Sequence, residues 1–118
     1  MDIAIAYSTM IVKNLEESVK FYTEVMQFKV DSKFEPKLGT KIALLRGKAE
    51  TMLEIIEDKS FPVGLYSVGM NVENLETTVE ELRSKGAKII LEITPTLVGS
   101  MAMIEDPNGI KFALIQHN

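Results

Sequence analysis

The apolar residues of the chain fall into short runs whose spacing predicts the secondary structure. Ile3 to Val12 is almost wholly apolar or small and has no helical stripe, which is typical of a strand covered on both faces. Apolar residues then recur at spacings of four, three and four: Leu15, Val19, Tyr22 and Met26. This spacing predicts a helix with one buried face, and Asn14 in front of it can cap its first turn, with Glu17 reaching back as in a capping box.

The same pattern returns in the second half of the chain. The segment 12–19, VKNLEESV, recurs as 72–79, VENLETTV, at an offset of 60 residues. In this copy Asn74 is the predicted cap, and Gly86 can adopt the left-handed conformation that ends a helix. The repeat predicts two halves of similar structure.

Three candidate strands follow each predicted helix. They span 28–34, 41–46 and 51–57 in the first half, and 87–93, 97–104 and 110–116 in the second. Asp106-Pro-Asn-Gly109 separates the last two with a strong tight-turn signal. We therefore expect an α+β fold in one domain over residues 1–118, with βαβββ modules at about 1–60 and 61–118 and a hinge near 58–62.

Composition narrows the function classes. Hydrophobic residues make up 46% and charged residues 25% of 118 residues, as in ordinary globular chains. The chain has no cysteine, no apolar run of membrane-spanning length and no signal-peptide pattern, so we expect a cytoplasmic protein without a membrane partner. The net charge is −4 and the basic residues are scattered, which disfavours nucleic acid and suits a neutral or cationic small molecule.

Two motifs resemble those of a known superfamily. The segment 10–22, MIVKNLEESVKFY, is similar to a strand followed by V-x-D-L-x-x-S-x-x-F-Y, and 106–114, DPNGIKFAL, is similar to D-P-x-G-n-x-i-E-L. Both motifs, with the repeat, resemble the vicinal oxygen chelate superfamily, which includes glyoxalase I, bleomycin-resistance proteins, extradiol dioxygenases and methylmalonyl-CoA epimerases. The resemblance implies two βαβββ modules whose curled mixed sheets form a cup, commonly within a homodimer.

The resemblance also implies four positions that hold a divalent metal in the metal-using members. Two lie on the opening strands, eight residues before the leucine that follows each cap, and two on the closing strands. In this chain the four positions are occupied by Tyr7, Glu54, Ser67 and Ala113. Only Glu54 is a usual ligand, and a metal site needs about three suitable donors, so we expect no metal and no other cofactor.

Glu54 has two interpretations from the sequence. Strand alternation places it on one face with Met52 and Ile56, where it is the polar residue among apolar neighbours. In the functional interpretation it lies in the cup, binds a cationic or hydroxyl-bearing ligand with Tyr7, and can act as a base because burial raises its pKa. In the structural one it faces solvent at a sheet margin, or is a relic bonded to Tyr7 and water.

The same alternation extends the candidate ligand-binding set. We expect it to comprise seven residues: Tyr7, Thr9, Met52, Glu54, Ser67, Met101 and Ala113. The leading hypothesis is a small-molecule binder or sequestering protein of the bleomycin-resistance type that uses no metal. The alternatives are a glyoxalase-like lyase or isomerase with Glu54 as its base, and a non-catalytic protein whose role is dimerisation or contact with a partner.

Overall fold

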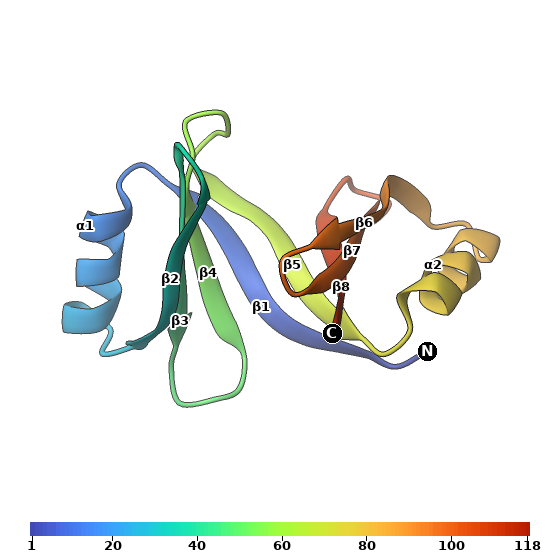
Figure 1. Ribbon diagram of the computed structural model, residues 1–118, viewed down its shortest axis with the longest axis horizontal. Coiled ribbons are helices and arrows are strands. Elements are labelled where there is room, and N and C mark those ends of the chain that lie inside the picture. The colour runs from blue at the N-terminus through green and yellow to red at the C-terminus, as the bar shows by residue number, and fades with distance from the viewer. The chain divides into compact units, whose positions relative to one another are not determined.

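The computed structural model describes residues 1–118 and shows the predicted order of elements twice (Figure 1). The first half contains a strand, a helix that continues into a π-helical turn, and three strands: β1 (Ile3–Val12), α1 (Leu15–Lys20), η1 (Phe21–Val25), β2 (Lys29–Lys37), β3 (Thr40–Arg46) and β4 (Met52–Glu57). The second half repeats the order: β5 (Gly64–Val72), α2 (Leu75–Ser84), β6 (Lys88–Thr96), β7 (Gly99–Glu105) and β8 (Lys111–His117). The prediction of two βαβββ modules in an α+β fold is confirmed.

The chain divides into two compact units. The first unit comprises residues 7–66, and the second comprises residues 1–6 together with 67–118. Strand β1 therefore begins in the second unit and continues in the first. No helix of the protein is both long enough and apolar enough to cross a membrane.

The first unit packs α1 against one face of the strands in the order β2-β3-β4-β1. Strands β1 and β4 are parallel, and the other neighbours are antiparallel. Leu15, Ala43, Leu45 and Ile55 form the buried core, with Met10 packed beside them. Burying these side chains between helix and sheet supplies the main driving force for folding this unit.

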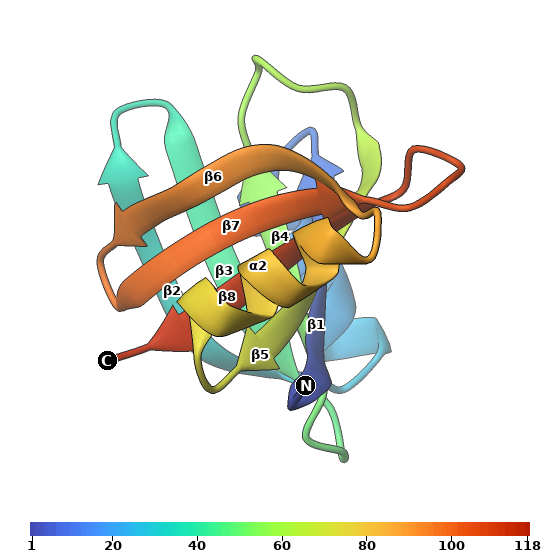
Figure 2. The same ribbon diagram turned by 90° about the vertical axis from the view of Figure 1, so that its right-hand side faces the viewer.

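The second unit repeats this arrangement in the strand order β5-β8-β7-β6. Strand β8 is parallel to β5 and antiparallel to β7, and α2 lies along one face of the strands (Figure 2). The core here comprises Val72, Leu75, Val79, Ala102 and Leu114. Met70 packs against this core as Met10 does in the first unit, so these two methionines have the same structural role in both units.

The predicted helix caps are present. Asn14 and Asn74 accept hydrogen bonds from the backbone N–H groups of Glu17 at 2.9 Å and Thr77 at 3.0 Å. At the other end of α2, Gly86 has φ 95° and donates to the Arg83 carbonyl, while the next residue donates back to the carbonyl of residue 82. This pair of bonds is the Schellman arrangement, which requires a left-handed residue.

The end of the first helix differs from the prediction. Residues 21–25 form a π-helical turn, and the left-handed residue that ends it is Gln27, with φ 62°. A π turn adds one residue to the helix. Met26 directly precedes the left-handed residue Gln27, as Lys85 directly precedes Gly86 at the end of α2. Its side chain is 48% exposed. The prediction that Met26 belongs to the buried face of the helix is therefore wrong.

The extra residue also changes the repeat offset. The capping residues Asn14 and Asn74 are 60 residues apart. After the π turn, equivalent positions of the two modules are 59 residues apart: Gln27 and Gly86 at the helix ends, and Glu57 and Gln116 on the closing strands. Each of these last two side chains accepts a hydrogen bond of 2.7 Å from the first N–H group of its own helix, at Leu15 or Leu75. The closing strand of each module thus holds the start of its helix, a contact absent from the sequence prediction.

The turn at 106–109 is also as predicted. The Asp106 carboxylate accepts from the N–H groups of Asn108 and Ile110, both at 2.8 Å, and its carbonyl accepts from Gly109, whose φ is 82°. Asp106 thus binds its own turn, as aspartate commonly does in this position.

Candidate functional site

The face of the first unit that points away from α1 carries a mixed set of polar and apolar side chains. Strand neighbours Leu53 and Ile55 pack toward the helix, so Met52 and Glu54 point to the opposite face. The parallel register pairs Tyr7 with Met52 and Thr9 with Glu54. Four of the seven predicted site residues therefore lie together on adjacent strands, in two rows.

Glu54 is half-buried and is held by Thr9. The Thr9 hydroxyl, whose residue is only 3% exposed, donates to Glu54 Oε1 at 2.8 Å. Burial raises the pKa of Glu54, because the charged form loses hydration, and the Thr9 hydrogen bond partly opposes this rise. This environment disagrees with a carboxylate that faces open solvent at a sheet margin.

Tyr7 lies in the neighbouring row and responds to the same environment. Burial raises the pKa of its phenol, and the nearby Glu54 carboxylate raises that pKa further. Tyr7 is therefore a protonated hydroxyl at neutral pH, available as a hydrogen-bond donor or acceptor. Together the two rows present a hydroxyl from Tyr7, a carboxyl from Glu54 and an apolar surface from Met52.

The other three predicted site residues lie in the second unit. Ser67 on β5 and Ala113 on β8 are each 5% exposed, and Met101 on β7 is half-buried. Ala102 and Leu114 pack toward α2, so Met101 and Ala113 point to the opposite face of that unit. This face offers one hydroxyl and otherwise apolar groups, and it carries no ionisable side chain among the predicted positions.

Sequence reasoning did not include Arg46, a charged residue on the Glu54 face. Arg46, the last residue of β3, pairs in register with Met52 and donates from Nη2 to Met52 Sδ at 3.3 Å. Its Nε and Nη2 also contact Asp31 Oδ1 at 3.4 and 3.2 Å. Alternation within 41–46 indicates which face Arg46 occupies, but only the strand register shows that it stands beside Met52.

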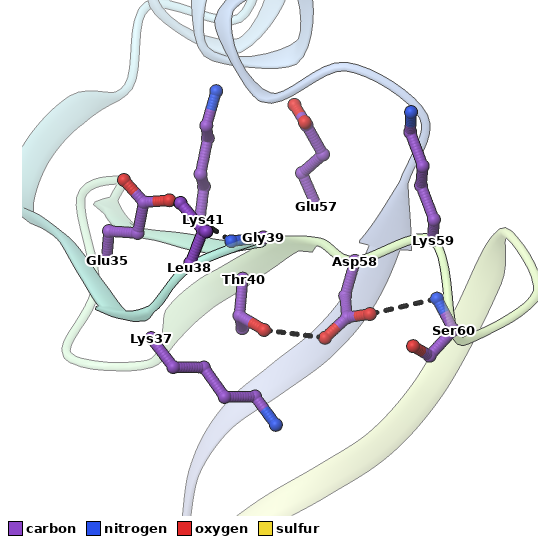
Figure 3. A pocket seen from close by; sticks show the side chains of 10 residues that line it. All are labelled: Glu35, Lys37, Leu38, Gly39, Thr40, Lys41, Glu57, Asp58, Lys59 and Ser60. Atoms are coloured by element: carbon purple, nitrogen blue, oxygen red, sulfur yellow. Dashed lines mark hydrogen bonds between the residues drawn. The ribbon is translucent and has the colours of Figure 1, made fainter.

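A hollow in the first unit lies away from this face. It has a volume of about 600 Å³, is open to solvent, and is lined by the β2–β3 turn and the segment after β4. Asp58 in its wall accepts from the Thr40 hydroxyl at 2.7 Å and the Ser60 N–H at 2.9 Å, and these bonds hold the pKa of Asp58 below its usual value (Figure 3).

The charged groups of this hollow do not converge. Lys41 and Lys59 extend to one side with Glu57, whereas Lys37 extends to the other (Figure 3). The Glu57 carboxylate is already bound to the start of α1. The hollow therefore lacks a focused polar centre, and the Glu54 face remains the candidate site.

Comparison with known proteins identifies the family. The model of the Glyoxalase/Bleomycin resistance protein/Dioxygenase superfamily matches residues 4–114. The chain belongs to this superfamily. The predicted resemblance is thereby confirmed, and it extends over nearly the whole chain.

Two curated members of the superfamily are similar in sequence. A probable lactoylglutathione lyase of Synechocystis sp. (strain ATCC 27184 / PCC 6803 / Kazusa) is 30% identical over 116 residues, which cover 89% of this chain and 88% of that protein. A probable chloroplastic lactoylglutathione lyase of Arabidopsis thaliana is 29% identical over 116 residues, again 89% of this chain. The match spans 33% of the Arabidopsis protein, so this chain corresponds to about a third of its length.

A solved structure of the superfamily confirms the fold. Methylmalonyl-CoA epimerase from Mycobacterium tuberculosis superposes with a TM-score of 0.82 at 16% identity, covering 97% of this chain and 87% of that one. At this level of identity the likeness shows the fold and leaves the activity to the side chains.

The side chains at the superfamily's four metal positions do not suit a divalent metal. In the first unit Glu54 is a possible ligand, but burial keeps Tyr7 protonated and therefore a poor one. In the second unit Ser67 offers a neutral hydroxyl and Ala113 no donor atom. No group of three His, Cys, Asp or Glu side chains is arranged to hold a metal ion. The donor set does not fit the metal of the metal-using members.

Proposed function

We propose that this superfamily member binds a small organic molecule on the face formed by Tyr7, Thr9, Met52 and Glu54, and that recognition uses these side chains in place of a metal. The other residues that the sequence predicts to bind ligand, Ser67, Met101 and Ala113, lie in the second unit and stay a prediction. The ligand presents a hydroxyl or cationic group to Glu54 and an apolar part to Met52. Binding or sequestration of this kind is the function that we infer.

One observation carries the proposal. Among the residues at the four superfamily positions, only Glu54 is a usual metal ligand. Its side chain is half-buried and accepts a hydrogen bond from Thr9. A carboxyl that is kept from water yet flanked by hydroxyls can direct a polar group of a ligand. Apolar neighbours then supply contact area, and the flexible thioether of Met52 can adapt to different ligands.

A thermal-shift screen tests the proposal. We expect hydroxyl-bearing or cationic organic compounds to raise the melting temperature of the wild type by several degrees, and Mn²⁺, Ni²⁺ or Zn²⁺ to leave it nearly unchanged. Glu54→Gln should lose most of the organic-ligand shift, whereas Glu50→Gln, which removes an exposed carboxylate, should keep it. Stabilisation by a transition ion that is lost in Glu54→Gln would contradict the proposal.

A second candidate is proton transfer by Glu54, in a lyase or isomerase. The raised pKa of Glu54 favours it, because a base works best when its pKa lies near the working pH. The names of the two curated relatives and of the epimerase agree with this class. Against it, the residues at the four positions supply few strong donors for a developing oxyanion.

Assays with the methylglyoxal–glutathione adduct separate the two candidates. For a binder we expect the wild type and Glu54→Gln to show the same background rate, with or without added divalent metal. Turnover by the wild type that Glu54→Gln abolishes, while Glu50→Gln retains it, would establish catalysis by Glu54 instead.

Assembly and location remain predictions of the sequence. We propose a homodimer in the cytoplasm, which size-exclusion chromatography with light scattering and cell fractionation can test. If no compound in a wide screen stabilises the protein, the third interpretation, a non-catalytic dimerisation or partner-binding protein, gains support.

A further inference from the structure

We infer that Arg46 is the anchor for an anionic group of the ligand, so that the site takes small organic acids that carry a hydroxyl. This inference rests on the proposed function, because it assumes that the ligand lies on the Glu54 face. It specifies the ligand class as hydroxycarboxylates, with the carboxylate on Arg46 and the hydroxyl toward Glu54.

The strand register places Arg46 at the edge of this site. Arg46 stands opposite Met52, and Leu44, two residues earlier on β3, stands opposite Glu54. Residues two apart on a strand are separated by about 7 Å and point to the same face. Arg46 and Glu54 are therefore one row apart, which suits a ligand of a few carbon atoms.

The guanidinium lies between Met52 on one side and Asp31 on the other. Its Nη2 donates to Met52 Sδ at 3.3 Å, and Met52 is the register partner of Tyr7. The Nε and Nη2 groups also hold Asp31 Oδ1, at 3.4 and 3.2 Å, so that this carboxylate steadies the side chain. None of these three bonds uses Nη1, so its N–H groups can donate to a ligand carboxylate while Nε and Nη2 stay on Asp31.

The ion pair between Arg46 and Asp31 is exposed enough for a ligand carboxylate to replace Asp31. The two side chains are 44% and 37% exposed, and pairs this exposed contribute little to stability. A ligand carboxylate can therefore compete with Asp31 or share the guanidinium with it. Asp31 in this arrangement limits the affinity for anions, and its removal should strengthen binding.

Heteronuclear NMR titration with matched probes tests the assignment. The probes are 2-hydroxybutyrate, 3-hydroxybutyrate and 4-hydroxybutyrate, the amide of each, and butyrate. We expect at least one hydroxybutyrate to shift the Arg46 Nε resonance and the amides of β1 and β4, with an affinity at least about tenfold above that of its amide and of butyrate, as charge-assisted bonding predicts.

Three variants separate anchoring from a structural role. Arg46→Gln should abolish the preference for carboxylate over amide, and Asp31→Asn should increase carboxylate affinity by severalfold. A merely structural ion pair would instead make both variants bind more weakly. Lys59→Gln removes a positive charge from the hollow beyond β4 and should bind as the wild type does.

The outcomes distinguish this inference from the proposed function. If the uncharged amides bind the Glu54 face as well as the hydroxybutyrates do, or if Arg46→Gln keeps the preference, the anchor is wrong and the proposed site stands. If none of the probes shifts resonances on this face, while cationic or other hydroxyl compounds do, the anionic class is wrong. If no organic compound binds there at all, both proposals fail.

Discussion

At the scale of single residues, Glu54 shows how position on a strand sets the chemistry of a side chain. Its backbone lies between Leu53 and Ile55, which pack against the helix, so its carboxylate is directed to the opposite face. There burial raises its pKa, while the Thr9 hydroxyl stabilises the charged form. The balance of these two effects decides when the site carries a negative charge.

The raised pKa predicts a specific pH dependence of stability. The folded protein retains the Glu54 proton at pH values where the unfolded chain has lost it. The resulting stabilisation is complete below the ordinary pKa of glutamate and is lost as the pH rises through the raised value. Thermal unfolding of wild type and Glu54→Gln between about pH 4 and 9 should therefore diverge toward high pH, with the variant melting higher.

A divergence of about 4 °C would correspond to about 1 kcal/mol in a domain of this size. Glu50→Gln, at an exposed position, is the control and should follow the wild type.

Thr9→Val should raise the pKa of Glu54 further, and Thr9→Ser should not, as read from the carboxyl ¹³C shift of Glu54. Equal melting curves for Glu54→Gln and wild type at all pH values would contradict this account.

At the scale of elements, each helix is held at its start by two side chains. The local one is the capping asparagine, Asn14 or Asn74. The distant one is on the closing strand, where Glu57 and Gln116 accept from Leu15 and Leu75. A carboxylate in one module and an amide in the other do the same work, because only an acceptor oxygen is required.

This equivalence predicts how the caps respond to substitution. Asn14→Ala and Asn74→Ala should each cost about 1 kcal/mol of unfolding free energy, the usual value of a cap. Glu57→Gln should cost less than about 0.5 kcal/mol, because the amide oxygen can replace the carboxylate, whereas Glu57→Leu leaves an N–H group unpaired and should cost about 1–3 kcal/mol. Urea denaturation measures all four. An equal loss in Glu57→Gln and Glu57→Leu would mean that charge, and not hydrogen bonding, holds the helix.

At the scale of the whole molecule, the two units do not follow the sequence halves. Residues 1–6 belong with residues 67–118, while Tyr7 and the rest of β1 belong with the first unit. The chain therefore passes between the units within β1 and again within β5. If the chain is divided between its sequence halves, residues 1–6 stay in the N-terminal fragment. The C-terminal fragment then lacks this part of the second unit.

This organisation predicts where an N-terminal deletion acts. Removing residues 2–6 should increase amide hydrogen exchange mainly in β8 and in the part of β5 from Ser67 onward, which belong to the same unit, and less in β2, β3 and β4. In the control variant, residues 2–6 are replaced by a different apolar strand sequence. This variant keeps the backbone of the segment and changes only its side chains. If amide hydrogen exchange increased only in β2, β3 and β4, the assignment of residues 1–6 to the second unit would be contradicted.

The sequence determined the order of elements, because each element has a local cause. Alternation and apolar runs specify the strands, the two asparagines specify where helices begin, and glycines at 86 and 109 permit the left-handed residues that end a helix and close a turn. The repeat and the motifs gave the superfamily. Alternation also placed Glu54 on one strand face with Met52 and Ile56, and it left open whether that face is covered or faces solvent.

Only the tertiary structure decided the features that depend on which strands are neighbours. The Thr9–Glu54 bond, the approach of Arg46 to Met52, and the hold of Glu57 on the first helix join residues on different strands or on a strand and a helix. The π turn that exposes Met26 reflects one inserted residue, which local periodicity cannot distinguish from an ordinary helical stripe. Strand order and register arise from packing of the whole unit, and they set the distances on which the site depends.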